Sequence, residues 1–287
     1  MKLLITGAQG QVGSALVRAA QARHDQVCAY SRAALDITDK AALAKAFTEH
    51  KPDWVINAAA YTAVDKAEAE PQQAFAINAL AVKSLAEVCK AADLPLVHLS
   101  TDYVFDGSGQ RPYLETDPTA PLNVYGETKA QGELALQELW PKHLILRVSW
   151  VFGEEGNNFV KTMLRLMQER TELKVVTDQR GGPTYAGDIA RAILQMIQKP
   201  VWGLYHFAGS PVRTWYEFAQ AISVEARLQG AALKIEKILP IPTRAYPTPA
   251  PRPLNSVLNT QLFQQTFGAM NNDWRLGLKK VIAAYLA

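Results

Sequence analysis

A tyrosine and a lysine four positions apart, Tyr125 and Lys129, are the residues of this chain best suited to moving a proton. On a helix such a pair shares one face, so the ammonium group of Lys129 is expected near the phenol of Tyr125. A nearby positive charge favours the ionised phenol, whose ordinary pKa is about 10, and helps a tyrosine to exchange a proton at neutral pH. The pair alone is a weak indication, because a surface tyrosine and a solvated lysine often have this spacing.

A glycine-rich turn near the N-terminus strengthens the indication. Gly7, Gly10 and Gly13 follow the apolar run 2–5 and precede a helical stretch that begins at Gln11. The order strand, glycine turn, helix is the context of a dinucleotide-binding fingerprint, although an ordinary turn with three glycines is the alternative. The first glycine permits the tight turn, the second lets the backbone approach a pyrophosphate, and the third lets helix and strand pack closely. Free N–H groups at the start of the helix, near Gln11 and Val12, would face the phosphates.

Alternating apolar strands and helical stretches over residues 1–152 predict the elements that position these motifs. Strands are expected near 3–5, 27–30, 55–57, 97–100 and 144–148, and helices near 11–23, 40–50, 75–92 and 125–139. This repetition predicts an α/β fold with a Rossmann-type, doubly wound parallel sheet. Cofactor and substrate are then expected at the carboxyl ends of the strands. After Trp150 the pattern loosens, with helices expected over 158–170 and 188–198 and strands over 173–176 and 203–207.

Bulk composition narrows the class of protein. The 287 residues, 48% hydrophobic and 20% charged, allow one large core or two domains. A net charge of +3 with no block of lysine and arginine argues against a nucleic-acid or membrane partner. Cys28 and Cys89 form no disulfide framework, and the first strand begins too early for a signal segment. We therefore expect a cytoplasmic protein.

The glycine spacing Gly-x2-Gly-x2-Gly, together with the Tyr-x3-Lys pair, resembles the extended short-chain dehydrogenase/reductase superfamily. Longer runs resemble the dTDP-4-dehydrorhamnose reductase family within it, and they lie at 58–68, 100–107, 121–129, 147–151, 156–163, 178–184 and 252–256. The resemblance covers nearly the whole chain. It implies NADPH-dependent reduction of the C4 ketone of dTDP-4-dehydro-β-L-rhamnose to dTDP-L-rhamnose, the final step of dTDP-rhamnose biosynthesis.

The resemblance also implies roles for particular residues. Tyr125 would be the general acid, Lys129 would favour its ionisation and hold the nicotinamide ribose, and Thr101 would donate a hydrogen bond to the carbonyl oxygen. Asn78 would be a structural and proton-relay residue. The residues expected to contact substrate are Thr101, Asp102, Trp150, Asn158 and Arg252. An aspartate after a strand is more often a turn or cap residue, and for Asp65 we favour that structural interpretation, as a cap of the helical run 66–70.

The residues after the second strand predict the choice of cofactor. NAD-selective sites place an acidic residue there, whereas this chain has Ser31 and Arg32, which suit a 2′-phosphate. We therefore expect NADPH, with NADH tolerated, although an exposed loop arginine is the alternative interpretation. Asp36 and Ile37 resemble the adenine-side contact of the family. The cofactor-binding residues expected are Gly7, Gly10, Gln11, Val12, Gly13, Ser31, Arg32, Asp36, Ile37, Ala58, Ala59, Ala60, Tyr61, Thr62, Tyr125 and Lys129.

The second half of the chain is expected to cover the substrate. We predict a dinucleotide-binding domain over 1–152, an interleaved substrate-binding lobe over 153–287, and a return of 183–209 to the first domain. Six of the 16 prolines lie between Pro240 and Pro253, and no two of them have the spacing of a PxxP ligand. We interpret this segment as a wall of the sugar-nucleotide pocket rather than as a disordered linker.

No metal is expected, because the five histidines show no paired ligand spacing. Some reductases of the family are metal-bridged dimers, but the matching positions here are Ala15 and Gly187, whose side chains cannot ligate. We therefore expect a monomer or a homodimer not bridged by metal. Two other functions stay open: an epimerase or dehydratase with tightly held NAD, and a non-catalytic regulatory subunit of the methionine adenosyltransferase type.

Overall fold

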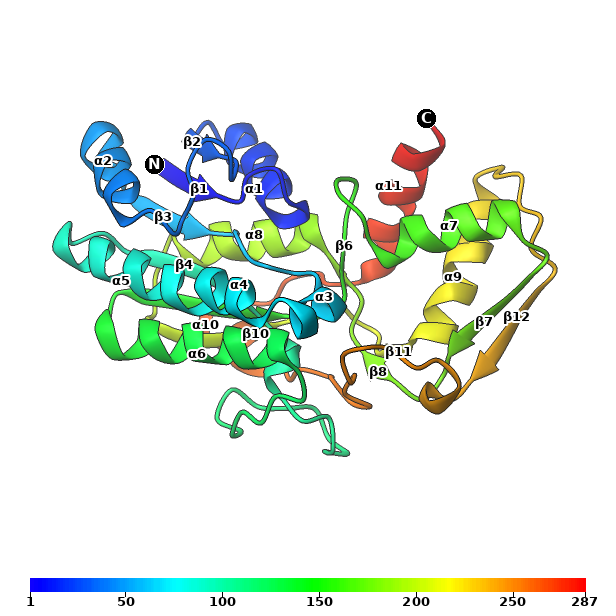
Figure 1. Cartoon of the computed structure of the whole chain (residues 1–287). Helices are drawn as coiled ribbons and strands as arrows, with labels where there is room; N and C mark the ends of the chain where they lie inside the picture. Colours follow the sequence, from blue (N-terminus) through cyan, green and yellow to red (C-terminus); the bar gives the residue numbers. More distant parts are fainter.

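The computed structural model describes residues 1–287 and has two lobes side by side (Figure 1). The larger lobe is built on six strands in the order β10-β5-β4-β3-β1-β2, all parallel. Their bounds are β1 (Lys2–Thr6), β2 (Gln26–Tyr30), β3 (Trp54–Asn57), β4 (Leu96–Thr101), β5 (His143–Val148) and β10 (Gly203–Phe207). The predicted doubly wound parallel sheet is confirmed.

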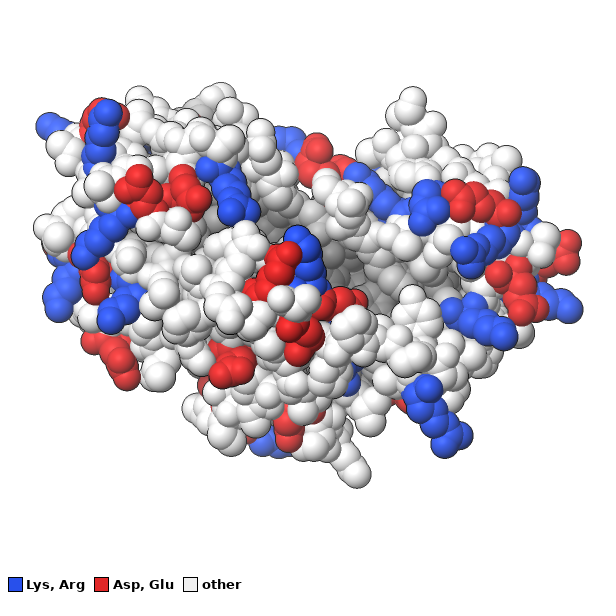
Figure 2. All heavy atoms as spheres, in the orientation of Figure 1, with Lys and Arg blue, Asp and Glu red and all other residues white.

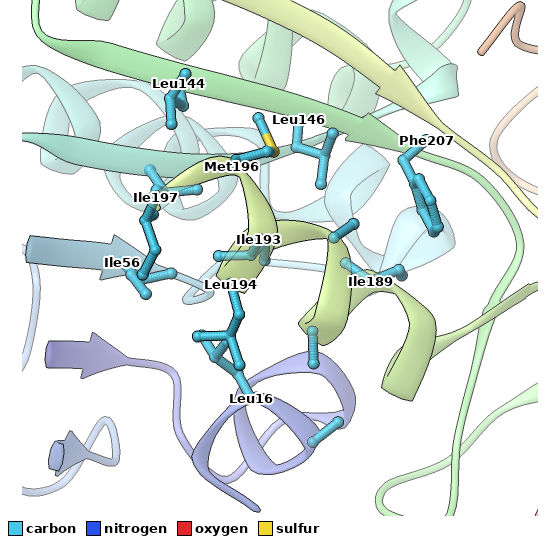
Figure 3. Packing of buried hydrophobic residues seen from close by; sticks show 14 of the residues in the cluster. Leu16, Ile56, Leu144, Leu146, Ile189, Ile193, Leu194, Met196, Ile197 and Phe207 are labelled. Atoms are coloured by element: carbon cyan, nitrogen blue, oxygen red, sulfur yellow. The ribbon is translucent and has the colours of Figure 1, made fainter. Parts of the chain in front are cut away.

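Helices cover both faces of this sheet (Figure 1). One face carries α1 (Gln11–Ala22) and α8 (Ala186–Met196), and the other carries α2 (Lys40–His50), α5 (Ala81–Ala91) and α6 (Val124–Leu139). In α8, Ile189 and Ile193 recur at helical spacing and give the helix one apolar face. Figure 3 shows this face packed on β5 residues, while Leu194 meets Leu16 of α1. Both helices therefore share one core with the strands that lead to the site.

The stretch predicted as a single helix over 75–92 is longer and irregular. It begins as α4 (Pro71–Phe75), passes through a π-helical segment (Ala76–Leu80) and continues as α5. Asn78 lies buried in the π-helical segment, where its side chain accepts the Tyr61 N–H at 2.8 Å and donates to the Thr128 hydroxyl at 3.1 Å. A π-turn in a helix often marks a functional region, and periodicity alone does not reveal it.

The smaller lobe is formed by α7 (Phe159–Glu169), α9 (Trp215–Leu228), α11 (Trp274–Leu286) and the parallel pair β7 (Glu172–Val176) and β12 (Lys237–Ile241) (Figure 1). Its core is rich in aromatic side chains, among them Phe152, Phe218 and Trp274. The short elements are α3 (Val64–Ala69), α10 (Gln261–Phe267), β6 (Val151–Phe152), β8 (Arg180–Gly181), β9 (Thr184–Tyr185) and β11 (Arg213–Thr214). No helix is long and apolar enough to cross a membrane.

The interpretation of Asp65 as a helix cap is wrong. The N-cap position of α3 is Ala63, and Asp65 lies inside the first turn. Its carboxylate instead pairs with Arg252 at 2.9 Å and accepts the N–H of Ala250 at 3.2 Å. This aspartate therefore ties the proline-rich segment to the larger lobe.

Candidate active site

A cavity of about 780 Å³ lies where the carboxyl ends of the sheet strands face the smaller lobe. Figure 2 shows this face of the molecule hollowed between the lobes, with charges of both signs scattered over the surface. The cavity is lined by most of the residues that the sequence predicted: Gly7, Gly10, Gln11, Val12, Ser31, Arg32, Asp36, Ile37, Ala58, Ala59, Ala60, Thr62, Thr101, Asp102, Tyr125, Lys129 and Trp150.

The glycine turn between β1 and α1 leaves room for an anion. Gly7 has φ +67°, and a Cβ there would lie 2.5 Å from the Ala59 nitrogen. A Cβ on Gly13 would lie 2.1 Å from the Gly7 carbonyl oxygen, so the predicted close packing is present. The N-cap residue Gly10 has no side-chain cap, which leaves the first N–H groups of α1 free of a side-chain acceptor. These features fit the pyrophosphate of a dinucleotide.

Tyr125 lies in the first turn of α6, beside the carboxyl end of β4. Asn123 starts this helix by accepting the Gly126 N–H at 2.8 Å. Burial raises the pKa of Tyr125 to about 12, a hydrogen bond with Thr101 lowers it, and the charge of Asp102 raises it. The phenol is therefore protonated at neutral pH, which is the form required of a general acid.

Lys129 lies four residues after Tyr125 on α6 and lines the same cavity. Its Nζ donates to the Leu99 carbonyl at 2.6 Å and lies 3.2 Å from His98 Nε2. Burial lowers the pKa of Lys129 to about 8, with the charge of Glu133 acting in the opposite direction. The expected lowering of the phenol pKa by this lysine stays a prediction.

Two side-chain oxygen atoms at the end of β4 are buried without a hydrogen-bond partner in the protein. Asp102 Oδ1 accepts from the Thr101 hydroxyl at 3.1 Å, but Asp102 Oδ2 and Ser100 Oγ have no hydrogen-bond partner. Burial raises the pKa of Asp102 to about 7, although the nearby Ser256 and Thr101 hydroxyls oppose the shift. Both residues line the cavity. Buried polar atoms without partners at such a place fit contacts with a polar ligand.

An aromatic wall closes the side of the cavity that belongs to the smaller lobe. Trp150 has φ +47°, donates from Nε1 to Ser256 at 3.2 Å, and stacks on Trp215 with ring centroids 3.5 Å apart. Phe159 lies against Trp215 at a centroid distance of 4.5 Å. A left-handed tryptophan is uncommon, and such conformations concentrate at functional sites. Sequence reasoning identified Trp150 but missed Trp215 and Phe159. Trp215 was missed because helix α9 was not predicted, and Phe159 lies in the family-like run 156–163 but was given no role there.

The structure does not bring four of the expected residues into the lining: Gly13, Tyr61, Asn158 and Arg252. Asn158 caps α7 by accepting the Lys161 N–H at 3.1 Å, and it donates to the Gln11 side chain at 3.0 Å. Its neighbour Asn157 lines the cavity instead. The Tyr61 hydroxyl donates to Glu70 at 2.8 Å.

The proline-rich segment does not form the expected wall. None of the residues from Pro240 to Pro253 lines the cavity. Arg252 pairs with Asp65, and the Pro251 carbonyl accepts from the Asn123 side chain at 2.9 Å. The segment therefore fastens the C-terminal part of the chain to α3 and the start of α6.

Several lining residues were not among the expected site residues: Gln9, Leu35, Val64, Ile77, Leu99, Ser100, Tyr103, Val148, Val151, Gly156, Asn157, Phe159 and Trp215. Of these, only Leu35, Ile77, Leu99 and Trp215 lie outside the glycine turn and the family-like runs. At the far end of the cavity, Asp36 accepts from the Thr38 N–H and hydroxyl at 2.9 and 2.8 Å, and these hydrogen bonds lower its pKa. Arg32 lines the same end and is exposed.

No group of three histidine, cysteine, aspartate or glutamate side chains is placed to hold a metal ion.

Comparison with known proteins gives a consistent result. The family model described as the RmlD substrate binding domain matches residues 1–287. A dTDP-4-dehydrorhamnose reductase of Escherichia coli K12 is 48% identical, with 98% of this chain and 97% of that protein covered. The crystal structure of a dTDP-4-dehydrorhamnose reductase from Clostridium acetobutylicum is similar at TM-score 0.94 and 40% identity, covering all of both chains. That of the Bacillus anthracis reductase, in complex with NADP, has TM-score 0.92 and 35% identity over 98% of both chains.

Proposed function

The chain belongs to the RmlD substrate-binding-domain family, and from this premise we propose that it is a dTDP-4-dehydrorhamnose reductase. It reduces the C4 ketone of dTDP-4-dehydro-β-L-rhamnose to dTDP-L-rhamnose with NADPH. The observation that carries the proposal is that Thr101, Tyr125 and Lys129 line one cavity together with the glycine turn at α1. A proton donor and a dinucleotide cradle in one cavity are what such a reduction requires.

NADPH supplies the hydride when it is bound, and the residues of the chain manage the oxygen of the ketone. Tyr125 donates its proton to this oxygen, and the Thr101 hydroxyl donates a hydrogen bond to it. Burial keeps the Tyr125 phenol protonated, so that it can donate its proton to the ketone oxygen. Asp102 and Ser100 offer unpartnered oxygen atoms to the hydroxyl groups of the sugar. The Trp150–Trp215 stack offers a flat apolar surface beside them.

We assign the ends of the cavity to parts of the cofactor and substrate. The free N–H groups of α1 hold the pyrophosphate, Ser31 and Arg32 hold the 2′-phosphate, and Asp36 and Ile37 lie at the adenine. The lobe around the six-stranded sheet binds cofactor, and the smaller lobe binds the nucleotide sugar. Asn158 and Arg252 support this site from outside the lining, by holding α7 and the C-terminal segment.

The test follows NADPH absorbance after addition of dTDP-4-dehydrorhamnose, with the corresponding GDP-4-keto sugar as control. We expect oxidation with the dTDP sugar and a loss of roughly 10²–10⁴-fold in turnover for Tyr125→Phe, with NADPH binding retained. Tyr103→Phe is the matched control, because its ring lies 5.7 Å from that of Tyr125 and most turnover should remain. No oxidation by the wild-type protein would contradict the proposed function and would favour a non-catalytic regulatory subunit.

The oligomeric state and location complete the proposal. We propose a monomer or a homodimer not bridged by metal, because Ala15 and Gly187 offer no ligating side chain. An unchanged solution mass by light scattering with and without a chelator is the expected result, and dissociation by the chelator alone would contradict it. A cytoplasmic location fits the two free cysteines, Cys28 and Cys89.

A further inference from the structure

The segment 253–257 lies beside β8 of the smaller lobe (Figure 1). Asn255 and Arg180 form a parallel bridge, and the Ser256 N–H donates to the Arg180 carbonyl at 2.8 Å. The Asn255 side chain donates to the Arg111 carbonyl at 3.0 Å, which holds the segment from its other side. These contacts fix the backbone of Ser256, a residue that is 2% exposed.

The hydroxyl of Ser256 meets the indole of Trp150. Trp150 Nε1–H donates to Ser256 Oγ at 3.2 Å, and this is the only hydrogen bond of the indole. An indole nitrogen can only donate, so the hydroxyl oxygen accepts and keeps its own proton for another partner. The Arg180 carbonyl lies 3.4 Å from Oγ. The Asp102 carboxyl is also near, because the Ser256 hydroxyl opposes the rise in its pKa that burial causes.

Stacking and hydrogen bonding fix different properties of the Trp150 ring. The ring lies on that of Trp215 with an angle of 4° between the two planes. A stacked ring can still slide or turn within its own plane, so the stack fixes the plane alone. The indole has one polar atom, and the hydrogen bond at Nε1 therefore decides which edge of the ring faces the cavity. Trp150 and Asp102 line this cavity, whereas Ser256 does not.

We propose that Ser256 is a positioning residue for the sugar nucleotide, because its hydroxyl holds the indole of Trp150 in the cavity wall without touching the substrate. The consequence for the substrate rests on the proposed function. A ring that is ordered beforehand loses no freedom when the sugar nucleotide binds, so the hydroxyl contributes to affinity. It lies outside the cavity that holds Thr101 and Tyr125, so it leaves the proton transfer itself unchanged.

The segment does not depend on this hydroxyl for its place. The Ser256 N–H and the Asn255 side chain both hold it through backbone carbonyls. Ser256→Ala keeps both of these contacts and removes the acceptor of the Trp150 N–H. The substitution therefore separates the position of the indole from the position of the segment.

The first experiment is proton–nitrogen NMR of the indole N–H groups in the substrate-free protein, with the Trp150 signal identified by its loss in Trp150→Phe. In Ser256→Ala we expect this signal to shift and its exchange with water to become about fivefold faster, the ratio for one neutral hydrogen bond. The Trp274 indole is the internal control, because it donates to the Pro211 carbonyl at 2.7 Å and should not change. An unchanged Trp150 signal would overturn the proposal. These spectra need no substrate, so a failure of the proposed reaction leaves this result valid.

The second experiment is a double-mutant cycle in steady-state kinetics. Ser256→Ala should raise KM for the sugar nucleotide about fivefold and leave kcat and KM for NADPH within about twofold. In the Trp150→Phe background, where the ring has no N–H, the same substitution should change KM by less than about twofold. A KM that Ser256→Ala leaves unchanged, or raises by the same factor in both backgrounds, would overturn the proposal.

Thr248→Val is the matched control for the kinetic cycle. Its hydroxyl donates to the Ala250 carbonyl at 2.8 Å and makes no hydrogen bond to Trp150, so KM should not change. A rise in KM equal to that of Ser256→Ala would assign the effect to the C-terminal segment and overturn the role of the hydroxyl. If Ser256→Ala does not fold, Ser256→Cys replaces it in both backgrounds, because a thiol is a much weaker acceptor.

Discussion

Replacing Asp102 with asparagine should remove a loss of stability that the wild-type protein undergoes as the pH rises. Burial raises the pKa of this carboxyl from 3.8 to about 7 in the folded state, and one of its oxygen atoms has no partner. Between these two pH values the folded protein holds a proton that the unfolded chain has already lost. Wild-type stability therefore falls as pH rises through this window and levels off above pH 7. Asparagine cannot ionise, so the variant does not share this fall.

The size of the effect follows from the shift. Roughly three pKa units correspond to ~4 kcal/mol in the free energy of unfolding, of which ~3 kcal/mol falls between pH 5 and pH 8.5. Because Asp102 is 2% exposed, solvent screening does not reduce this figure much. The amide of the variant leaves a buried donor without a partner, which costs ~1–3 kcal/mol at every pH. The comparison between the two pH values removes this constant cost.

The measurement is urea unfolding of wild type and Asp102→Asn at pH 5 and pH 8.5, followed by tryptophan fluorescence. The difference between variant and wild type should grow by ~3 kcal/mol in favour of the variant at the higher pH. Asp117→Asn is a control without pH dependence in this range, because a hydrogen bond from Arg111 lowers the pKa of that carboxyl from 3.8 to about 2, and it is ionised in both the folded and the unfolded protein at pH 5 and at pH 8.5. An Asp102→Asn difference that is the same at both pH values would refute the buried, protonated carboxyl.

Three further predictions concern the walls of the site. A Cβ on Gly181 would lie 2.4 Å from the Trp150 ring, so Gly181→Ala should displace the indole. In steady-state assays, KM for the sugar nucleotide should then rise about tenfold, with kcat less affected. An unchanged KM would contradict the role of the ring. Arg32→Ala should lower the preference for NADPH over NADH by about 10–100-fold in kcat/KM, because a charged hydrogen bond contributes ~1.5–3 kcal/mol. An unchanged preference would show that Arg32 does not bind the 2′-phosphate. The Arg252–Asp65 pair is partly exposed, so a double-mutant cycle of unfolding should give a coupling energy of only ~0–1 kcal/mol. Both single alanine variants should raise KM. A coupling energy far above this range would show that the ion pair behaves as a buried one.

The local sequence pattern was sufficient to predict the strands of the larger lobe. Each predicted strand there lies within one or two residues of its observed bounds, because buried parallel strands are short apolar runs separated by helices. The glycine turn, Thr101 and Tyr125 were found for the same reason: they sit directly at strand ends and helix starts, where sequence order decides position. Helix α9 was missed, and Trp215 with it, although Thr214 and Glu217 form a capping box at the start of this helix, which is a signal that the sequence carries.

The amino-acid sequence by itself determined which groups reach the carboxyl ends of the strands, because strand, turn and helix follow from local spacing. Tertiary structure alone decided how those groups are used. Lys129 lies four residues after Tyr125, yet its nitrogen is bound to β4. Asn158 and Arg252 belong to family-like motifs, yet their polar atoms are engaged in a helix cap and an ion pair. Burial and hydrogen-bond partners arise from residues far apart in the chain, and they set both the protonation state and the direction of each side chain.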